Sequence, residues 1–212
     1  MIIFVADAFA EHLIGGAELT TEAIIDDCLL PYKKVLSSQL NLGFINKNKD
    51  KYFIFANFSG VHEDLLIHIA KNINYSVVEY DYKFCKYRSV KKHEKAEGKC
   101  DCHEVSKRGK SVAIFLAKSK SNFWMSEKQK QIYLDRFDFL RKSNNIVLSS
   151  VFSRDTLEFF KDYKIPEKNK KWLILKSSSW IKGTADSIQY AQDNKLDYEL
   201  VGGLSHKELL KK

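Results

Sequence analysis

The chain has 212 residues, of which 44% are hydrophobic, as in a globular protein with one large domain or two small ones. No apolar run is long enough to cross a bilayer, and the apolar start lacks the basic segment of a signal peptide, so we expect a cytoplasmic protein. The formal net charge is +8, but the lysines are interspersed with acids and only five residues are arginine. This pattern favours a solvated surface and disfavours a nucleic-acid partner; a weak attraction to anionic substrates or to a membrane surface is the alternative.

Short apolar runs typical of strands alternate with helix-like segments along the whole chain. The predicted strands are residues 2–9, 33–38, 51–59, 75–82, 121–126, 144–153, 172–178 and 197–203. The predicted helices are residues 16–30, 62–72, 109–119, 126–143, 153–163, 183–195 and 205–212. Such an alternation predicts an α/β fold in which a parallel sheet is flanked by crossover helices.

The register of this alternation changes near residue 165. Residues 164–171 are polar, contain one of the two prolines and are predicted to be a linker. We therefore predict a Rossmann-like domain over 1–165 and the start of a second Rossmann-like unit over 166–212. The second piece is too short to bury a sizeable hydrophobic core of its own. We therefore expect it to be truncated, or to pack against the first domain or another chain.

Two adjacent glycines, Gly15 and Gly16, separate the first predicted strand from the first predicted helix. Glycines let a backbone approach a ligand closely, and a helix N-terminus favours an anion. The dinucleotide fingerprint G-x-G-x-x-G is absent, which disfavours a dinucleotide site. On spacing alone, a phosphate-binding loop and a plain tight turn are equally good interpretations.

Two segments far apart in the chain carry a family resemblance. "GGAE" after the first strand, and "SSSWIKGTADSIQYAQDNKLDYELVGG" near the end, resemble retaining nucleotide-sugar glycosyltransferases of the GT-B fold, family 4 in the usual classification. They occur in the order expected for the N-terminal domain and the start of the C-terminal domain. The segments "FWMSEKQKQIY" and "NNIVLSSVFS" resemble the last strand, helix and strand of the N-terminal half.

The resemblance implies transfer of a sugar from a nucleoside diphosphate sugar to a glycan or lipid-linked acceptor, with no cofactor required. It implies that the Gly15–Gly16 backbone faces the donor diphosphate across an interdomain cleft, that Lys182 supports the leaving phosphates, and that Asp81 lies near the transferred sugar. The residues expected to bind the donor or acceptor are Gly15, Gly16, Glu18, His12, Arg88, Lys182 and Gly183, with Asp81 and Lys182 in the catalytic roles.

The chain also departs from the family pattern. The family carries a glutamate-rich acidic motif near the end of its C-terminal domain, and no residues here supply it. We therefore expect either part of an enzyme that needs a C-terminal half or partner chain, or a protein without transfer activity. The competing hypothesis is a non-catalytic Rossmann-like binding or assembly module, stapled by zinc, that recognises a phosphorylated sugar or a partner subunit.

Three of the four cysteines fall in the segment "YDYKFCKYRSVKKHEKAEGKCDCHE". Cys85, His93, Cys100 and Cys102 offer the thiolate and imidazole ligands of a structural zinc site, with His103 as an alternative to His93. The C-x-C spacing is unusual for such a site, so reduced thiols without a metal and a disulfide or redox pair stay open as alternatives.

Overall fold

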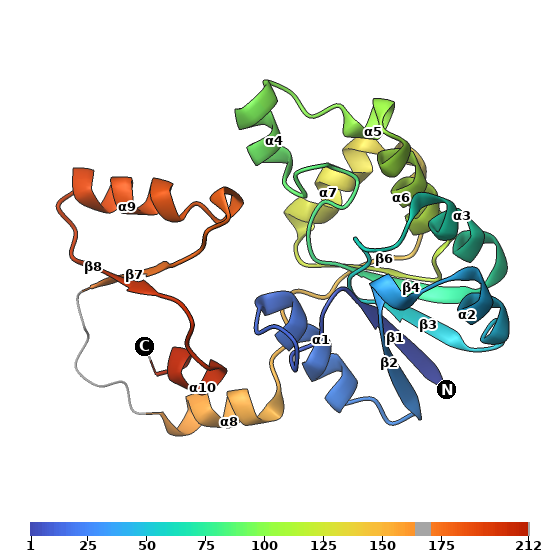
Figure 1. Cartoon of the computed structure of the whole chain (residues 1–212), viewed down its shortest axis with the longest axis horizontal. Coiled ribbons are helices and arrows are strands. Elements are labelled where there is room, and N and C mark those ends of the chain that lie inside the picture. The colour runs from blue at the N-terminus through green and yellow to red at the C-terminus, as the bar shows by residue number, and fades with distance from the viewer. Residues whose placement is uncertain (164–170, 212) are drawn as a thin grey trace. The chain divides into compact units, whose positions relative to one another are not determined.

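The computed structural model of the chain describes residues 1–163 and 171–211 (Figure 1). The chain divides into two compact units, Met1–Leu157 and Glu158–Lys212. Most of the predicted linker, residues 164–170, lies outside the described residues.

Unit 1 is an α/β fold of the Rossmann-like type, built on a six-stranded parallel sheet with the order β2-β1-β3-β4-β5-β6. Its strands are β1 (Ile2–Ala6), β2 (Tyr32–Leu36), β3 (Tyr52–Phe55), β4 (Asn74–Glu79), β5 (Asn122–Trp124) and β6 (Asn145–Val147). Its helices are α1 (Gly16–Asp26), α2 (Leu42–Lys47), α3 (Glu63–Asn72), α4 (Val90–Glu97), α5 (Cys102–Val105), α6 (Lys107–Lys118), α7 (Glu127–Arg136) and the start of α8 (Arg154–Asp162).

The central strands are apolar on both faces because helices pack on both sides of the sheet. Along β1, Ile3 and Val5 belong to the larger hydrophobic cluster, whereas Phe4 and Ala6 belong to a smaller one that includes Ile25 of α1. The larger cluster is aromatic; the rings of Tyr75 and Phe115 stack with centroids 4.5 Å apart. Burial of this cluster supplies the main driving force for folding of unit 1.

The strand order reverses direction between β1 and β3. β2 lies on one side of β1, while β3, β4, β5 and β6 follow on the other side (Figure 1). In open parallel sheets, the loops at the carboxyl ends diverge at such a topological switch point and leave a crevice where ligands bind. The loops after β1 and β3 are therefore the first place to look for a site.

The observed elements are shorter than some of the predicted ones. The helix predicted over 126–143 ends at Arg136, because Phe137 leaves the helical conformation and buries its ring; a 3-10 turn, Asp138–Lys142, follows. The strand predicted over 144–153 ends at Val147, since Ser149 adopts a positive φ of 64°. Helices α2, α4 and α5 were not predicted.

Unit 2 contains the end of α8 and a small parallel pair, β7 (Trp172–Leu175) and β8 (Tyr198–Val201). The two strands are joined by the 3-10 turn η3 (Trp180–Lys182) and helix α9 (Thr184–Asp193), and the short helix α10 (His206–Leu209) follows β8.

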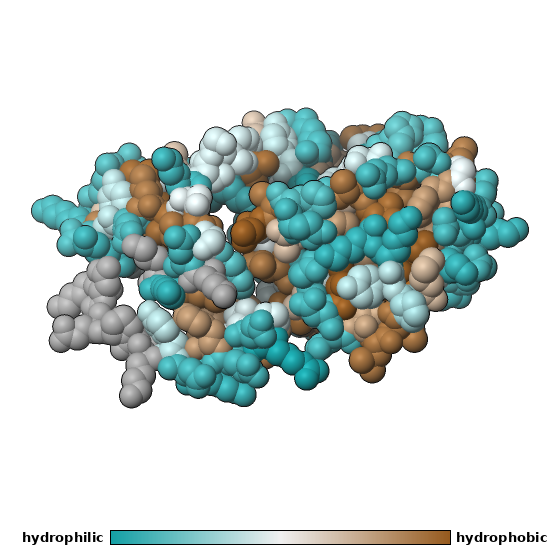
Figure 2. Space-filling model, turned by 60° about the horizontal axis from the view of Figure 1, so that its bottom comes forward, coloured by the Kyte–Doolittle hydropathy of each residue, from teal (hydrophilic) through white to brown (hydrophobic). Residues whose placement is uncertain are grey.

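Hydrophilic side chains cover much of the face of the chain that Figure 2 shows, with hydrophobic patches between them.

Candidate functional site

Asp7 connects three loops at the carboxyl ends of β1, β2 and β3. Its carboxylate accepts hydrogen bonds from Ser37 Oγ at 2.5 Å, from the backbone N–H groups of Ser59 and Gly60, both at 3.1 Å, and from Ser59 Oγ. Burial raises the pKa of Asp7, but the hydrogen bonds from Ser37 and Ser59 outweigh this effect and the net pKa is lowered. Asp7 thus holds the switch point together as an ionised carboxylate.

Asp81 and Arg88 form an ion pair at the same edge of the sheet. Arg88 donates from Nε to Asp81 Oδ2 at 2.7 Å and from Nη2 to the same oxygen. Its Nη1 also donates to Ser59 Oγ at 3.0 Å, and it lies 4.0 Å from the Asp7 carboxylate. The structure therefore brings together Asp81 and Arg88, two predicted site residues, in the loop that follows β4.

The environment of Asp81 keeps its carboxylate charged. Burial raises the pKa of Asp81, but the positive charges of Lys83 and Arg88 outweigh burial and lower it. An ionised, partly exposed carboxylate accepts hydrogen bonds well, whereas a lowered pKa makes it a weak base. The arrangement suits Asp81 to orient a hydroxyl group of a ligand.

A buried ion pair, which no sequence pattern predicted, lies beneath this surface. Lys83 Nζ is 3.1 Å from Glu79 Oε1, and both side chains are fully buried. Lys83 also donates to Asp81 Oδ1 at 3.3 Å. Burial raises the pKa of Glu79 to about 7, against the opposing charge of Lys83. Glu79 Oε2 has no hydrogen-bond partner among the described residues.

Gln129 of α7 fixes the loop that carries Asp81. Its amide Nε2 donates to the backbone carbonyl oxygens of Glu79 and Asp81, both at 2.9 Å, and its Oε1 accepts from the Met125 N–H at 2.7 Å. Because Gln129 is buried, these bonds are shielded from water and hold the loop firmly.

The glycine pair begins α1, as predicted, but the site there differs from the expectation in one respect. Gly15 caps the helix in an extended conformation, and no side chain caps the free N–H groups. The Glu18 carboxylate turns back towards this end; its Oε2 lies 2.4 Å from where a Cβ on Gly15 would be. A carboxylate already occupies this side of the turn, so a phosphate there would have to move Glu18 or bind beside it.

Two further contacts describe the surroundings of the glycine turn. Thr21 of α1 hydrogen-bonds through Oγ1 to the Tyr80 hydroxyl at 2.8 Å, which ties α1 to the loop after β4. His12 is exposed, and its Nδ1 accepts from the Phe9 N–H at 3.4 Å. His12 is therefore part of a local turn and leaves its Nε2 towards solvent.

Lys182 and Gly183 lie in unit 2, between β7 and α9. Lys182 is exposed in η3, and Gly183 adopts the left-handed conformation with a φ of 75° at the start of α9. The loop is closed by Thr184, whose Oγ1 donates to the Leu175 carbonyl oxygen at 2.7 Å and accepts from the Ser177 N–H at 3.1 Å. The positive φ explains why glycine stands beside Lys182.

The four metal-ligating candidates meet in one buried cluster. One ligand atom from each of Cys85, His93, Cys100 and Cys102 lies within 4.8 Å of all the others. All four cysteines of the chain are free thiols. The cluster could hold a metal ion. Local folding creates it: Ser89 caps α4 by accepting from the Lys92 N–H, which places His93 one turn into the helix, and Cys102 begins α5.

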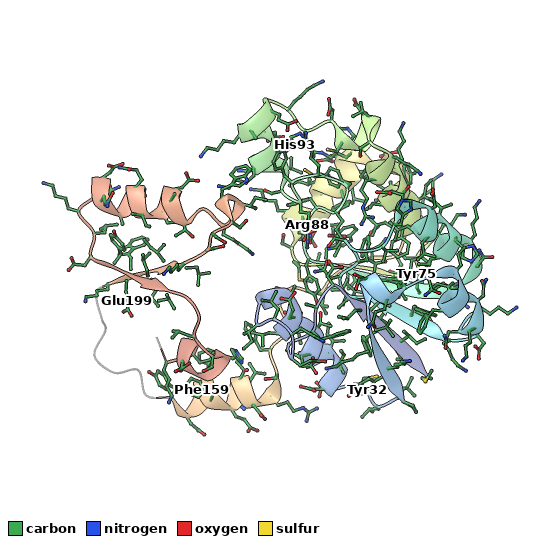
Figure 3. All side chains as sticks on the ribbon, viewed as in Figure 1. Tyr32, Tyr75, Arg88, His93, Phe159 and Glu199 are labelled. Carbon is green, nitrogen blue, oxygen red and sulfur yellow. The ribbon has the colours of Figure 1, made fainter. Side chains whose placement is uncertain are left out.

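The imidazole of His93, which is labelled in Figure 3, is oriented by partners on both sides of the ring. Its Nδ1 is 3.4 Å from Cys85 Sγ and 3.6 Å from Cys102 Sγ, while Nε2 is 3.1 Å from Glu97 Oε2. A metal-bound histidine often donates its second ring N–H to a carboxylate in this way. The alternative ligand His103 is not in the cluster.

Burial makes the free thiolates of this cluster unfavourable. It raises the pKa of Cys85, and raises that of Cys100 to about 12, with the neighbouring thiols adding to the effect on Cys100. A bound cation would reverse this preference because metal binding deprotonates its cysteine ligands.

Comparisons of the chain with known protein families, with curated proteins and with solved structures found no match. None of the helices in the described part of the chain is both long and apolar enough to cross a membrane.

Proposed function

We propose that the chain is a nucleotide-sugar glycosyltransferase of the GT-B type, or the N-terminal part of one. The observation that carries this proposal is the position of Asp7, Asp81 and Arg88 at the carboxyl edge of a parallel sheet, beside its switch point. In this proposal, the loop after β4 binds the acceptor of the sugar.

The proposed reaction transfers a sugar from a nucleoside diphosphate to an acceptor hydroxyl. The acceptor oxygen bonds to the anomeric carbon, the nucleoside diphosphate leaves with the bonding electron pair, and the proton of the acceptor hydroxyl passes to an oxygen of the departing diphosphate. Asp81 accepts a hydrogen bond from a sugar or acceptor hydroxyl, and Arg88 holds Asp81 in place. Lys182, exposed at the turn before α9, neutralises charge on the leaving diphosphate, with Gly183 giving that turn its shape.

We further propose that the buried cluster binds a structural zinc ion. A tetrahedral site with Zn–S bonds of about 2.3 Å and Zn–N bonds of about 2.0–2.1 Å has Sγ–N distances of about 3.6 Å. The two Sγ–Nδ1 distances to His93, 3.4 and 3.6 Å, fit that geometry. Three cysteines and one histidine fill the four positions, so the ion would have no open position for a substrate.

The competing proposal is a zinc-stapled binding or assembly module without catalysis. A closed structural metal site is compatible with it, because such a site explains the cysteine segment with no reaction at all. Both proposals share the zinc site and differ in whether sugar is transferred.

Incorporation of label from radioactive UDP and GDP sugars into polysaccharide and lipid fractions tests the transferase proposal. We expect incorporation that falls about 100-fold in Asp81→Asn, the order of effect seen when a polar group that stabilises a transition state is removed. The control is Asp135→Asn, an exposed carboxylate on α7 that pairs with Arg141. Incorporation unaffected by Asp81→Asn, in protein with an unchanged melting temperature, would contradict the assigned role.

A further inference from the structure

A groove lies between α4 and α7, beside the loop that carries Asp81 and Arg88. It has a volume of about 520 Å³. Its lining includes three cationic side chains, one carboxylate and two partly buried hydrophobic or aromatic ones: Lys91, Lys128, Arg136, Glu94, Tyr82 and Ile132. Neither functional proposal assigns a role to this groove.

The groove carries more positive than negative charge, and two of its cationic side chains have no ionic partner among the described residues. Within residues 1–163 and 171–211, neither Lys91 nor Lys128 makes an ion pair or side-chain hydrogen bond. Both are exposed, one on each wall. Glu94, the one carboxylate in the lining, forms an ion pair with Arg136, with 3.7 Å between Glu94 Oε1 and Arg136 Nη2. Three cations therefore face one carboxylate.

Arg136 forms one long ion pair with Glu94 and is held in place by two further contacts. Its guanidinium carbon lies 5.8 Å from the centroid of the Phe84 ring, and Nη1 donates weakly to the Ile132 carbonyl oxygen at 3.5 Å. Its Nε has no partner among the described residues. Nε is buried, so a ligand in the groove would meet the Nη groups, and a planar guanidinium is well suited to the oxygens of a phosphate group.

We propose that this groove binds a ligand through a phosphate group. Lys91 and Lys128 contribute point charges from opposite walls, and Arg136 contributes donors from one end of α7. The volume exceeds what one inorganic ion needs, and Tyr82 with Ile132 offers an apolar surface for the organic part of the ligand. A phosphorylated small molecule and a lipid headgroup share this chemistry. The inference does not depend on glycosyl transfer.

Calorimetric titration of the full chain with inorganic phosphate tests the groove. The variant is Lys91→Gln/Lys128→Gln, in which two exposed and unpaired lysines are replaced, so its fold is preserved. The control is Lys49→Gln/Lys118→Gln, which removes the same charge from exposed lysines elsewhere in unit 1. We expect the groove variant to weaken phosphate binding about tenfold, as the loss of two exposed ion pairs implies, and the control to change it little.

Two further arms identify the source of the phosphate. Glucose 1-phosphate represents a soluble sugar phosphate, and phosphatidylcholine vesicles with and without phosphatidic acid represent a lipid headgroup. Binding of either probe that depends on Lys91 and Lys128 supports the groove and names the ligand class. The proposal is overturned if the wild-type chain binds none of the three probes, or if the control variant weakens binding as much as the groove variant does.

Discussion

Nδ1 of His93 lies 3.4 Å from Sγ of Cys85, across a loop that also carries Arg88. Backbone contacts within the loop join the two features. The Arg88 N–H donates to the Cys85 carbonyl oxygen at 2.9 Å. Arg88 itself adopts a positive φ of 53°. A metal at Cys85 would therefore stabilise the backbone that aims Arg88 at Asp81.

The zinc proposal predicts about one zinc ion per chain by elemental analysis after purification. Cys100→Ser should lose the metal and melt at a lower temperature, because structural zinc contributes directly to folding. Cys28→Ser is the control, since Cys28 lies after α1 and outside the cluster. Equal zinc contents in Cys100→Ser and Cys28→Ser would rule out the assigned ligands.

Glu97 should increase the affinity of the cluster for zinc, although it is not itself a ligand. Its carboxylate orients the His93 ring through Nε2, so Glu97→Gln is expected to weaken zinc binding by about 10- to 100-fold in a competition with a chromophoric chelator. Glu127→Gln, on the exposed side of α7, serves as the matched control. If the two variants hold zinc equally well, His93 is not oriented by Glu97.

Asp7→Asn should destabilise unit 1 by about 2–4 kcal/mol, because a charged acceptor of several partly buried hydrogen bonds is lost. Since the pKa of Asp7 is lowered on folding, its contribution is present above the unfolded value of 3.8 and is lost as the pH falls through the folded one. Urea unfolding at neutral and acid pH measures both effects. The exposed Asp50→Asn variant should change stability little.

The contribution of Glu79 to stability should change with pH in the opposite direction to that of Asp7. Burial raises its folded pKa to about 7, above the model-compound value of 4.5, so the folded chain retains a proton that the unfolded chain releases between these values. The stability of the wild type relative to Glu79→Gln should therefore fall as the pH rises from about 4.5 to about 7. A stability difference that is constant over this range would show that Glu79 stays ionised throughout.

The strands and their order in the chain were predictable because β1 and β3 are continuous apolar runs, a pattern typical of a sheet covered on both faces. The crossovers that surround the cysteines were not predictable. α4 is strongly polar and buries only Val90 and His93, so its sequence lacks the apolar spacing that would predict a helix. The convergence of the cysteines depends on that helix.

The site at the sheet edge was predictable only in part. Asp81 and Arg88 follow a strand and so belong to the edge where ligands bind, which the sequence indicates. Lys83 lies in the same polar-looking loop, yet it is buried against Glu79, because the ring of Phe58 and the loop fixed by Gln129 enclose it. No sequence pattern distinguishes such a lysine from its solvated neighbours.

Calorimetric titration of the full chain with UDP and GDP is the sharpest test of the proposal that this chain binds a nucleoside diphosphate sugar. We expect binding of one of them, weakened in Lys182→Gln but not in Lys195→Gln, an exposed lysine just beyond the C-terminal end of α9. Absence of binding by both nucleotides, or equal binding by the two variants, would contradict it.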